Sequence, residues 1–274
     1  MTIVKTMAAL FYSYAILFIV SPSTAHAQPA APALSAMDIV QQCDNKNPGK
    51  DQVTQLTVTI KNKFGKSRKT VYYRFWKNLF DTEQQLDKMT LFTVAPPEVK
   101  NTAFMRYAYA PDLHKNADQW IYLPNLKKLR RVSIRDLGDR FLGSDLTYGD
   151  IGIRLPSYDK HILLGSKKSG ANQIFLIEST PNETDSIYSR KQAEYEMSKN
   201  TCLKRHINYY DRKGALLKTQ SIDWQKIDDA WLWKRVEIKN AQTFGSSIFE
   251  VSKAKVNVGI SEKWFTERML KRGL

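Results

Sequence analysis

The sequence predicts a mainly β protein built on one antiparallel sheet. Runs of alternating apolar and polar residues, rich in β-branched and aromatic side chains, recur along most of the chain and are separated by short polar turns. No 12-residue helical pattern stands between successive runs, so neighbouring hairpins are expected rather than βαβ units. A chain of 274 residues suits one large β domain.

The N-terminal residues 1–27 are predicted to be a signal peptide. Lys5 gives the positive start, Met7 to Val20 form an uncharged apolar run, and Ala25-His26-Ala27 has the pattern that signal peptidase cleaves. The run is shorter than the roughly 20 residues that a membrane span needs. We therefore expect export and cleavage after Ala27. Residues 28–34 are then a flexible leader, and 35–274 form a single domain.

Each element of that domain has a local signal. Ser35 is a suitable N-cap for a helix ending near Asp44. Residues 52–76 alternate around a turn at 62–65, which predicts a hairpin. Further strands are predicted at 89–97, 102–110, 118–124, 127–135, 173–180, 188–197, 202–210, 216–224, 230–240 and 247–258. A last short helix is expected over 261–272, capped by Ser261.

Charge and cysteine content narrow the functional classes. The net charge of +15 would favour nucleic acid in a cytoplasmic protein, but export argues against that partner. The charge fits attraction to anionic lipid head groups or an acidic partner, and it also fits solubility alone. Cys43 and Cys202 can form one disulfide in an oxidising compartment or remain two thiols, and their spacing leaves both alternatives open.

A search for catalytic chemistry finds little. The sequence has no G-x-S-x-G motif, and its histidines are scattered. Asp136, Asp139, Asp145 and Asp150 lie 3, 6 and 5 residues apart, unlike the near-alternate ligands of a calcium loop. We interpret them as carboxylates that cap turns or pair with arginines. We expect no catalytic residue, metal or cofactor, although an enzyme using this aspartate-rich loop is a rival hypothesis.

A basic row precedes these aspartates. It includes Lys127, Lys128, Arg130 and Arg131 on a predicted edge strand. Such charges protect a sheet edge from aggregation. The same residues could contact a partner protein or anionic head groups.

The combined block DQWIYLPNLKKLRRVSIRDLGDRFLGSDLTYGDI, residues 118–151, resembles the hallmark segment of the LolA-like family of outer-membrane lipoprotein-sorting proteins. The family pattern contains D-x-W-x-Y-L-P, an arginine pair, and F-x-G-S-D-x-x-Y-x-D. The matching residues are Asp118, Trp120, Tyr122, Leu123, Pro124, Arg130, Arg131, Phe141, Gly143, Ser144, Asp145, Tyr148 and Asp150. Residues 209–224 and 264–272 also resemble the family's second half.

The resemblance implies a half-open antiparallel β-barrel, with a few short helices covering its concave face and enclosing a hydrophobic cavity. It implies a monomeric carrier in the periplasm of a Gram-negative bacterium, which passes a lipid or acylated lipoprotein between membrane components, with an inner-membrane RND-type exporter as partner. The alternative is a non-catalytic, exporter-associated adaptor that docks through the basic row. Burial of ten methylenes would supply about 8 kcal/mol.

The same expectation assigns residues to the site. Gly143, Ser144, Asp145, Tyr148 and Asp150 would form a structured loop near the mouth, and the basic row would contact a partner or head groups. Plain core packing is the alternative for every cavity residue. The expected cavity residues are Phe104, Met105, Trp120, Tyr122, Phe141 and Trp224.

Overall fold

The computed structural model describes residues 34–80, 84–110, 113, 115–183 and 186–274. Residues Leu34–Leu274 form one compact unit. The predicted signal peptide, 1–27, and the leader up to residue 33 lie outside the described residues.

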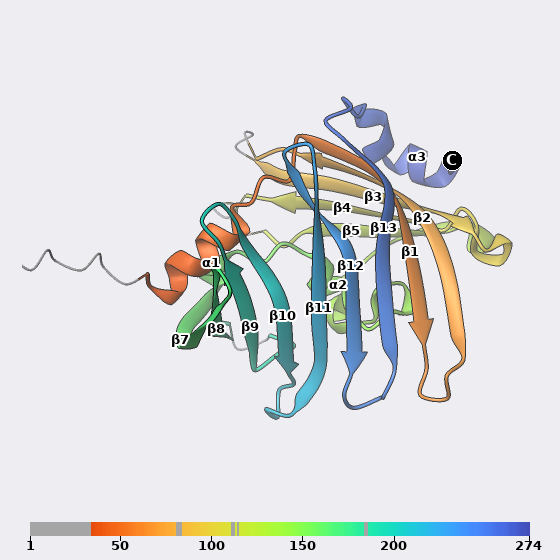
Figure 1. Cartoon of the computed structure of the whole chain (residues 1–274). Coiled ribbons are helices and arrows are strands. Elements are labelled where there is room, and N and C mark those ends of the chain that lie inside the picture. The colour runs from red at the N-terminus through yellow and green to blue at the C-terminus, as the bar shows by residue number, and fades with distance from the viewer. Residues whose placement is uncertain (1–33, 81–83, 111–112, 114, 184–185) are drawn as a thin grey trace, which may run out of the picture. The chain divides into compact units, whose positions relative to one another are not determined.

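A single 13-stranded antiparallel sheet forms the unit, in the spatial order β6-β5-β4-β3-β2-β1-β13-β12-β11-β10-β9-β8-β7 (Figure 1). From β1 to β6 and from β7 to β13, strands that follow each other in the sequence are also neighbours in the sheet. The pairing of β1 with β13 joins these two halves. The strands are β1 Asp51–Lys61, β2 Ser67–Asn78, β3 Gln85–Ala95, β4 Ala103–Tyr109, β5 Asp118–Leu123, β6 Lys128–Arg131, β7 Asp159–Ser169, β8 Asn172–Pro181, β9 Arg190–Met197, β10 Cys202–Tyr210, β11 Leu216–Ile227, β12 Ala230–Asn240 and β13 Ser246–Val256.

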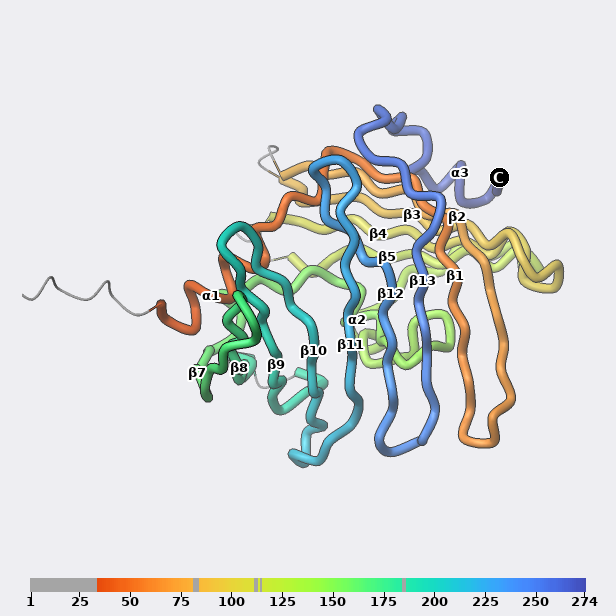
Figure 2. Tube along the Cα trace, in the orientation of Figure 1, coloured from red at the N-terminus to blue at the C-terminus, as the bar shows by residue number. Residues whose placement is uncertain are grey.

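The sheet curves strongly but does not close (Figures 1 and 2). In the described part of the chain its end strands, β6 and β7, do not pair with each other. The predicted half-open antiparallel architecture is therefore confirmed. Strand β7 was not predicted from the sequence. It is an edge strand, and nearly all of its residues after Asp159 are exposed, so it lacks the alternation that burial of one face produces.

The two faces of the sheet carry separate apolar clusters. Phe104 belongs to the cluster on the concave face, which joins residues from both halves of the sheet. The next residue, Met105, belongs to a smaller cluster on the opposite face. This is the period-2 alternation of a strand, with both side chains almost fully buried at 0% and 1% exposure. Neither face of this part of the sheet is left open to solvent.

Helix α1, Ala36–Asp44, begins at the predicted N-cap Ser35, which forms a capping box with Asp38. The helix lies against β7, β9 and β10 (Figure 1). A disulfide joins its buried Cys43 to Cys202 at the start of β10. The bridge anchors the N-terminal helix to a strand 159 residues further along the chain.

The C-terminal segment covers the opposite face. It consists of the 3-10 turn η7, Glu262–Phe265, and helix α3, Glu267–Arg272, rather than the single predicted helix. Ser261 caps the turn and Thr266 caps the helix, so the segment bends between them. Phe265 and Leu270 pack in the cluster that contains Met105.

A loop on the concave face as the candidate functional site

The motif block begins as strands β5 and β6, and its residues 134–151 then lie on the concave face as a chain of short turns (Figure 1). It contains the 3-10 turns η4, Ile134–Gly138, and η5, Phe141–Gly143, followed by helix α2, Tyr148–Ile151. We call residues 134–158 the plug loop. Its Phe141 ring packs edge-on against Phe104 at 4.9 Å and against Tyr148 at 5.6 Å. The loop is therefore part of the concave-face core, where its aromatic side chains meet those of the sheet.

The motif aspartates hold this loop. The Asp145 carboxylate accepts a hydrogen bond from the Ser247 hydroxyl at 2.6 Å, and the backbone amide of Asp145 donates to the Ser247 hydroxyl oxygen at 2.9 Å. Asp150 closes a capping box with Thr147 at the start of α2. It also accepts the Tyr188 hydroxyl at 2.9 Å. The interpretation that these carboxylates organise turns agrees with these contacts.

The predicted site omitted Lys218, which is the central cation of the loop. This side chain of β11 is 1% exposed. Its Nζ donates to an Asp150 carboxylate oxygen at 2.6 Å and to the Asp145 carbonyl at 2.7 Å. The sequence did contain a signal for this residue. Lys218 alternates with Gln220 and Ile222, so it lies on the face of β11 that points into the core.

Two further sheet side chains bind carbonyl groups of the plug loop. Arg106 on β4 donates to the Ile151 carbonyl and also pairs with Asp87. Gln119 on β5 donates to the Tyr148 carbonyl at 3.1 Å. Together with Lys218, these residues satisfy backbone acceptors that would otherwise be buried without partners. The loop is thus pinned to the sheet through its own backbone.

Electrostatics at Asp150 follow from this arrangement. Burial alone would raise the pKa of the carboxyl, but Lys218, Lys191 and the Thr147 amide outweigh burial and hold the pKa below its usual value. Burial and the Asp150 charge raise the pKa of Tyr188 well above that of a free tyrosine. Asp150 is therefore an anion, and Tyr188 a neutral hydrogen-bond donor, at neutral pH.

Gly143 and Ser144 shape the tight part of the loop. Gly143 has φ +77°, and a Cβ there would lie 2.9 Å from Nη2 of Arg68. Ser144 is fully buried, and its hydroxyl accepts the Leu146 amide at 3.2 Å. Glycine is suited to this position by its backbone angle, whereas the tip of the exposed Arg68 side chain could move aside for a Cβ.

The six expected cavity residues do not line one cavity. Phe104, Phe141 and Trp224 belong to the concave-face cluster. Met105, Trp120 and Tyr122 lie in the cluster under the C-terminal segment, and their assignment to a concave cavity was wrong. Adjacent strand residues such as Phe104 and Met105 must point to opposite faces, which the expectation overlooked.

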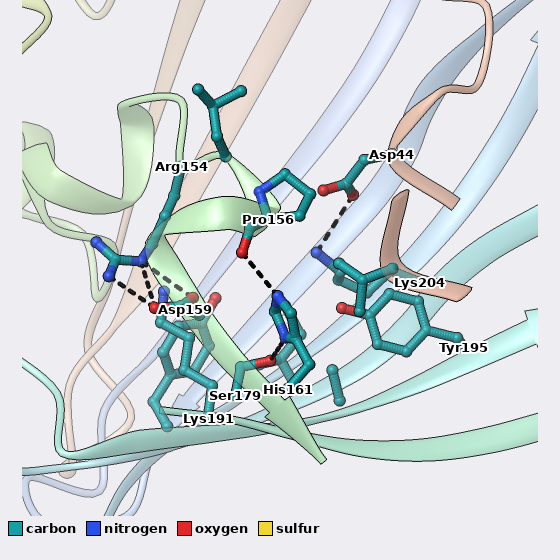
Figure 3. Close-up of a pocket in the computed structure, with 14 residues that line it drawn as sticks. Asp44, Arg154, Pro156, Asp159, His161, Ser179, Lys191, Tyr195 and Lys204 are labelled. Carbon is teal, nitrogen blue, oxygen red and sulfur yellow. Dashed lines mark hydrogen bonds and ion pairs between the residues drawn. The ribbon is translucent and has the colours of Figure 1, made fainter. Parts of the chain in front are cut away.

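A small pocket lies on the same concave side, between α1, residues 154–161 and strands β8–β10 (Figure 3). Its volume is about 110 Å³, below the roughly 300 Å³ at which drug-sized ligand sites begin. Its wall is partly polar. His161 contacts the Ser179 hydroxyl and the Pro156 carbonyl, both at 2.8 Å, so its two ring nitrogens are occupied.

Three cationic side chains, Arg154, Lys191 and Lys204, line the pocket. Arg154 pairs with Asp159 at 2.7 Å, and Lys204 pairs with Asp44 at 3.6 Å (Figure 3). In the described part of the chain no carboxylate comes within ion-pair distance of Lys191. Burial lowers the pKa of Lys191 to about 8. Lys191 thus brings a positive charge to the wall of the pocket, and the same charge helps to hold the pKa of Asp150 low.

The predicted basic contact row is only partly free. Arg130 pairs with Asp136 at 2.6 Å, and Arg131 pairs with Asp118. Lys127 and Lys128 are exposed at the edge formed by β6. The two arginine side chains are still 59% and 63% exposed, so all four members of the row remain accessible to a partner.

Within the described ranges, no group of three His, Cys, Asp or Glu side chains is placed to hold a metal ion. No described helix is long and apolar enough to cross a membrane.

Comparisons with known proteins agree on the fold. A family model described as "Uncharacterized protein" matches residues 85–272. No curated protein matches the chain. A solved domain from Vibrio parahaemolyticus, described as an outer membrane lipoprotein-sorting protein domain, is 26% identical with a TM-score of 0.76; the match covers 86% of this chain and 98% of that one.

Two further solved structures are similar in fold. A DUF1329 family protein from Desulfovibrio piger is 23% identical with a TM-score of 0.76, and the match covers 86% of this chain and 97% of that one. A LolA superfamily protein from Nitrosomonas europaea is 17% identical with a TM-score of 0.64, and the match covers 86% and 99%.

Proposed function

We propose that this chain, which belongs to the family whose model matches residues 85–272, is a LolA-like periplasmic carrier for a lipid or an acylated lipoprotein. The observation that carries the proposal is the plug loop. The concave face of the open sheet is apolar, and a loop with little regular structure covers it instead of another sheet or a long helix. The similar domain from Vibrio parahaemolyticus is described as an outer membrane lipoprotein-sorting protein domain, which supports the same class of cargo.

In this proposal the acyl chain binds where Phe141 of the loop now packs against Phe104, within the cluster that also contains Leu146. The pocket beside α1 is too small for a long chain, and in this proposal the cargo displaces the plug loop. Ten buried methylenes provide about 8 kcal/mol toward that displacement. The pocket around Lys191 would hold the anionic end of the cargo.

Release needs a partner, because the buried chain does not leave into water easily. We place an RND-type exporter in this role and the exposed Lys127 and Lys128 at its docking surface. The chain then acts as a monomer and performs no chemistry on its cargo. The adaptor alternative uses the same lysines, and it is favoured by the observation that the concave face is already filled.

The first experiment is purification from periplasm without detergent, followed by solvent extraction and mass spectrometry. A stoichiometric lipid or acylated peptide supports the carrier. A clean extract, together with no uptake of a photoreactive fatty acid, refutes it. In that case, loss of exporter binding in Lys127→Glu/Lys128→Glu would favour the adaptor.

A matched pair of variants then locates the site. Phe104→Ala removes a ring that contacts Phe141 and Tyr148, which loosens the loop and should increase fatty-acid uptake. Met105→Ala creates a comparable cavity on the opposite face and should leave uptake unchanged. Equal effects of the two variants would place the cargo somewhere other than the concave face. Photolabelled peptides, identified by mass spectrometry, give an independent map.

A further inference from the structure

Two hairpin turns at one margin of the sheet present phenylalanines to solvent. Phe64, between β1 and β2, is 83% exposed, and Phe244, between β12 and β13, is 75% exposed. Because β1 pairs with β13, the turns are neighbours: Lys61 lies opposite Ser246. A Cβ on Gly245 would lie 3.2 Å from the Lys61 carbonyl oxygen. Both hairpins reach the same margin in Figures 1 and 2.

Both turns are held by an asparagine side chain. Oδ1 of Asn62 accepts the amides of Phe64 and Lys66, each at 3.0 Å. Oδ1 of Asn240 accepts the amides of Gln242 at 3.0 Å and Thr243 at 2.8 Å. Phe64 and Phe244 therefore lie on turns that are ordered by hydrogen bonds.

The backbone at Phe244 adds a second argument. Its φ of +58° lies in the left-handed region, which a bulky residue rarely adopts. The fold does not recover this cost by burying the ring, since three-quarters of Phe244 is exposed. An unfavourable conformation that only exposes an apolar side chain points to a contact made outside the chain.

The surrounding charge indicates the nature of that contact. Residues 61–69, KNKFGKSRK, contain five basic and no acidic residues, and all nine are exposed. Basic side chains flanking an exposed aromatic ring are the combination that binds an anionic lipid surface, with the ring in the interfacial layer and the cations among head groups.

We propose that this margin docks on an anionic phospholipid bilayer by inserting Phe64 and Phe244. The rings stand on convex turns, which suits insertion into lipid better than contact with a flat protein surface. Asp145 of the plug loop bonds Ser247, close behind the Phe244 turn, so docking would bring the loop near the membrane. The inference does not depend on what cargo the protein carries.

The test is cosedimentation of the protein with vesicles of phosphatidylcholine alone or with phosphatidylglycerol added. The wild type should bind the anionic vesicles and release them as salt rises, because screening weakens the charge contacts. Phe64→Ser/Phe244→Ser should reduce partitioning at least about tenfold, since two aromatic insertions are lost. Lys63→Glu/Lys66→Glu should also weaken binding to anionic vesicles.

Phe80 provides a matched control. It is 66% exposed and follows Asn78 as Phe64 follows Asn62, with its amide bonded to the asparagine Oδ1 at 3.0 Å. It lies at the other end of β2, and Asp81 and Glu83 follow it in the sequence. Phe80→Ser should leave vesicle binding unchanged.

Three results would overturn the proposal: no binding of the wild type to anionic vesicles, binding that survives Phe64→Ser/Phe244→Ser, or an equal loss in Phe80→Ser. Sedimentation velocity adds a fourth, since a dimer abolished by the double variant without any vesicle binding would make this margin a protein interface. Lipid retained through purification by the double variant would separate docking from cargo binding.

Discussion

Replacing Lys218 with methionine tests whether one buried ion pair holds the plug loop. The Lys218 and Asp150 side chains are 2% and 5% exposed, so the substitution leaves a carboxylate with little access to water. Tyr188 and the Thr147 amide still bond Asp150, at 2.9 and 2.8 Å. Breaking a buried pair from one side typically costs about 3–5 kcal/mol of unfolding free energy, and we expect a loss in that range at pH 7.

The stability difference between Lys218→Met and the wild type should depend on pH. In the wild type the pKa of Asp150 lies below its usual value, so its contribution to stability is present at neutral pH and is lost only as pH falls through that low pKa. Loss of Lys218 removes the cation bonded to Asp150, so burial is offset only by Lys191 and the Thr147 amide, and the pKa should rise. The folded variant then takes up a proton as pH falls toward 5, and its deficit relative to the wild type should shrink.

Urea unfolding followed by tryptophan fluorescence at pH 7 and pH 5 measures both effects. Lys218→Met/Asp150→Asn should recover much of the loss, because the asparagine still accepts the Tyr188 hydroxyl without carrying a charge. The surface pair of Lys226 and Asp229, 48% and 88% exposed, supplies the control, and Lys226→Met should change stability by less than about 1 kcal/mol. A Lys218→Met deficit under about 1 kcal/mol, or one equal at both pH values, would refute the reasoning.

Three other changes have defined outcomes. Removing the disulfide with Cys43→Ser/Cys202→Ser should cost about 2–5 kcal/mol by urea unfolding, whereas an unchanged midpoint would show that the bridge constrains little. Lys191→Met should stabilise the protein at pH 7 by up to about 3 kcal/mol, because the wild-type lysine carries a buried charge. This advantage should fade as pH rises from about 8 toward 10.5, since the wild-type lysine then loses its charge. A constant difference in stability across that range would contradict the prediction. Gly143→Ala should lower stability by about 1 kcal/mol, because the backbone has φ +77°, and a neutral result would show that the loop can change this backbone angle at no cost.

Much of the fold could be predicted from alternation, because most strands bury one face. The hairpin of β1 and β2 and the start of α1 at Ser35 follow directly from local patterns. Strand β7 could not be found this way, since it buries almost nothing. The bend at Thr266 depends on packing of the C-terminal segment against the sheet, which a helical pattern does not reveal.

Prediction of the site was limited because the face of the sheet on which each side chain lies was not worked out. The motif loop was predicted to lie near the mouth of the half-barrel, and its aspartates were interpreted as structural. Lys218 lies 68 residues from its partner Asp150, so no local spacing links the two residues. The cavity assignment mixed the two faces because aromatic content was weighed without strand register. Phe104 and Met105 show that register alone would have separated them.

The plug loop is an internal competitor for the surface that a cargo would use. Under the carrier proposal, the apparent dissociation constant equals the intrinsic constant divided by the fraction of molecules whose loop is lifted. If lifting costs about 4 kcal/mol, that fraction is of order 10⁻³, and binding is weakened about a thousandfold. Any substitution that loosens Lys218, Arg106 or Gln119 should then tighten cargo binding while lowering stability. Affinity in such a molecule is set by the loop's own attachment as much as by its cargo.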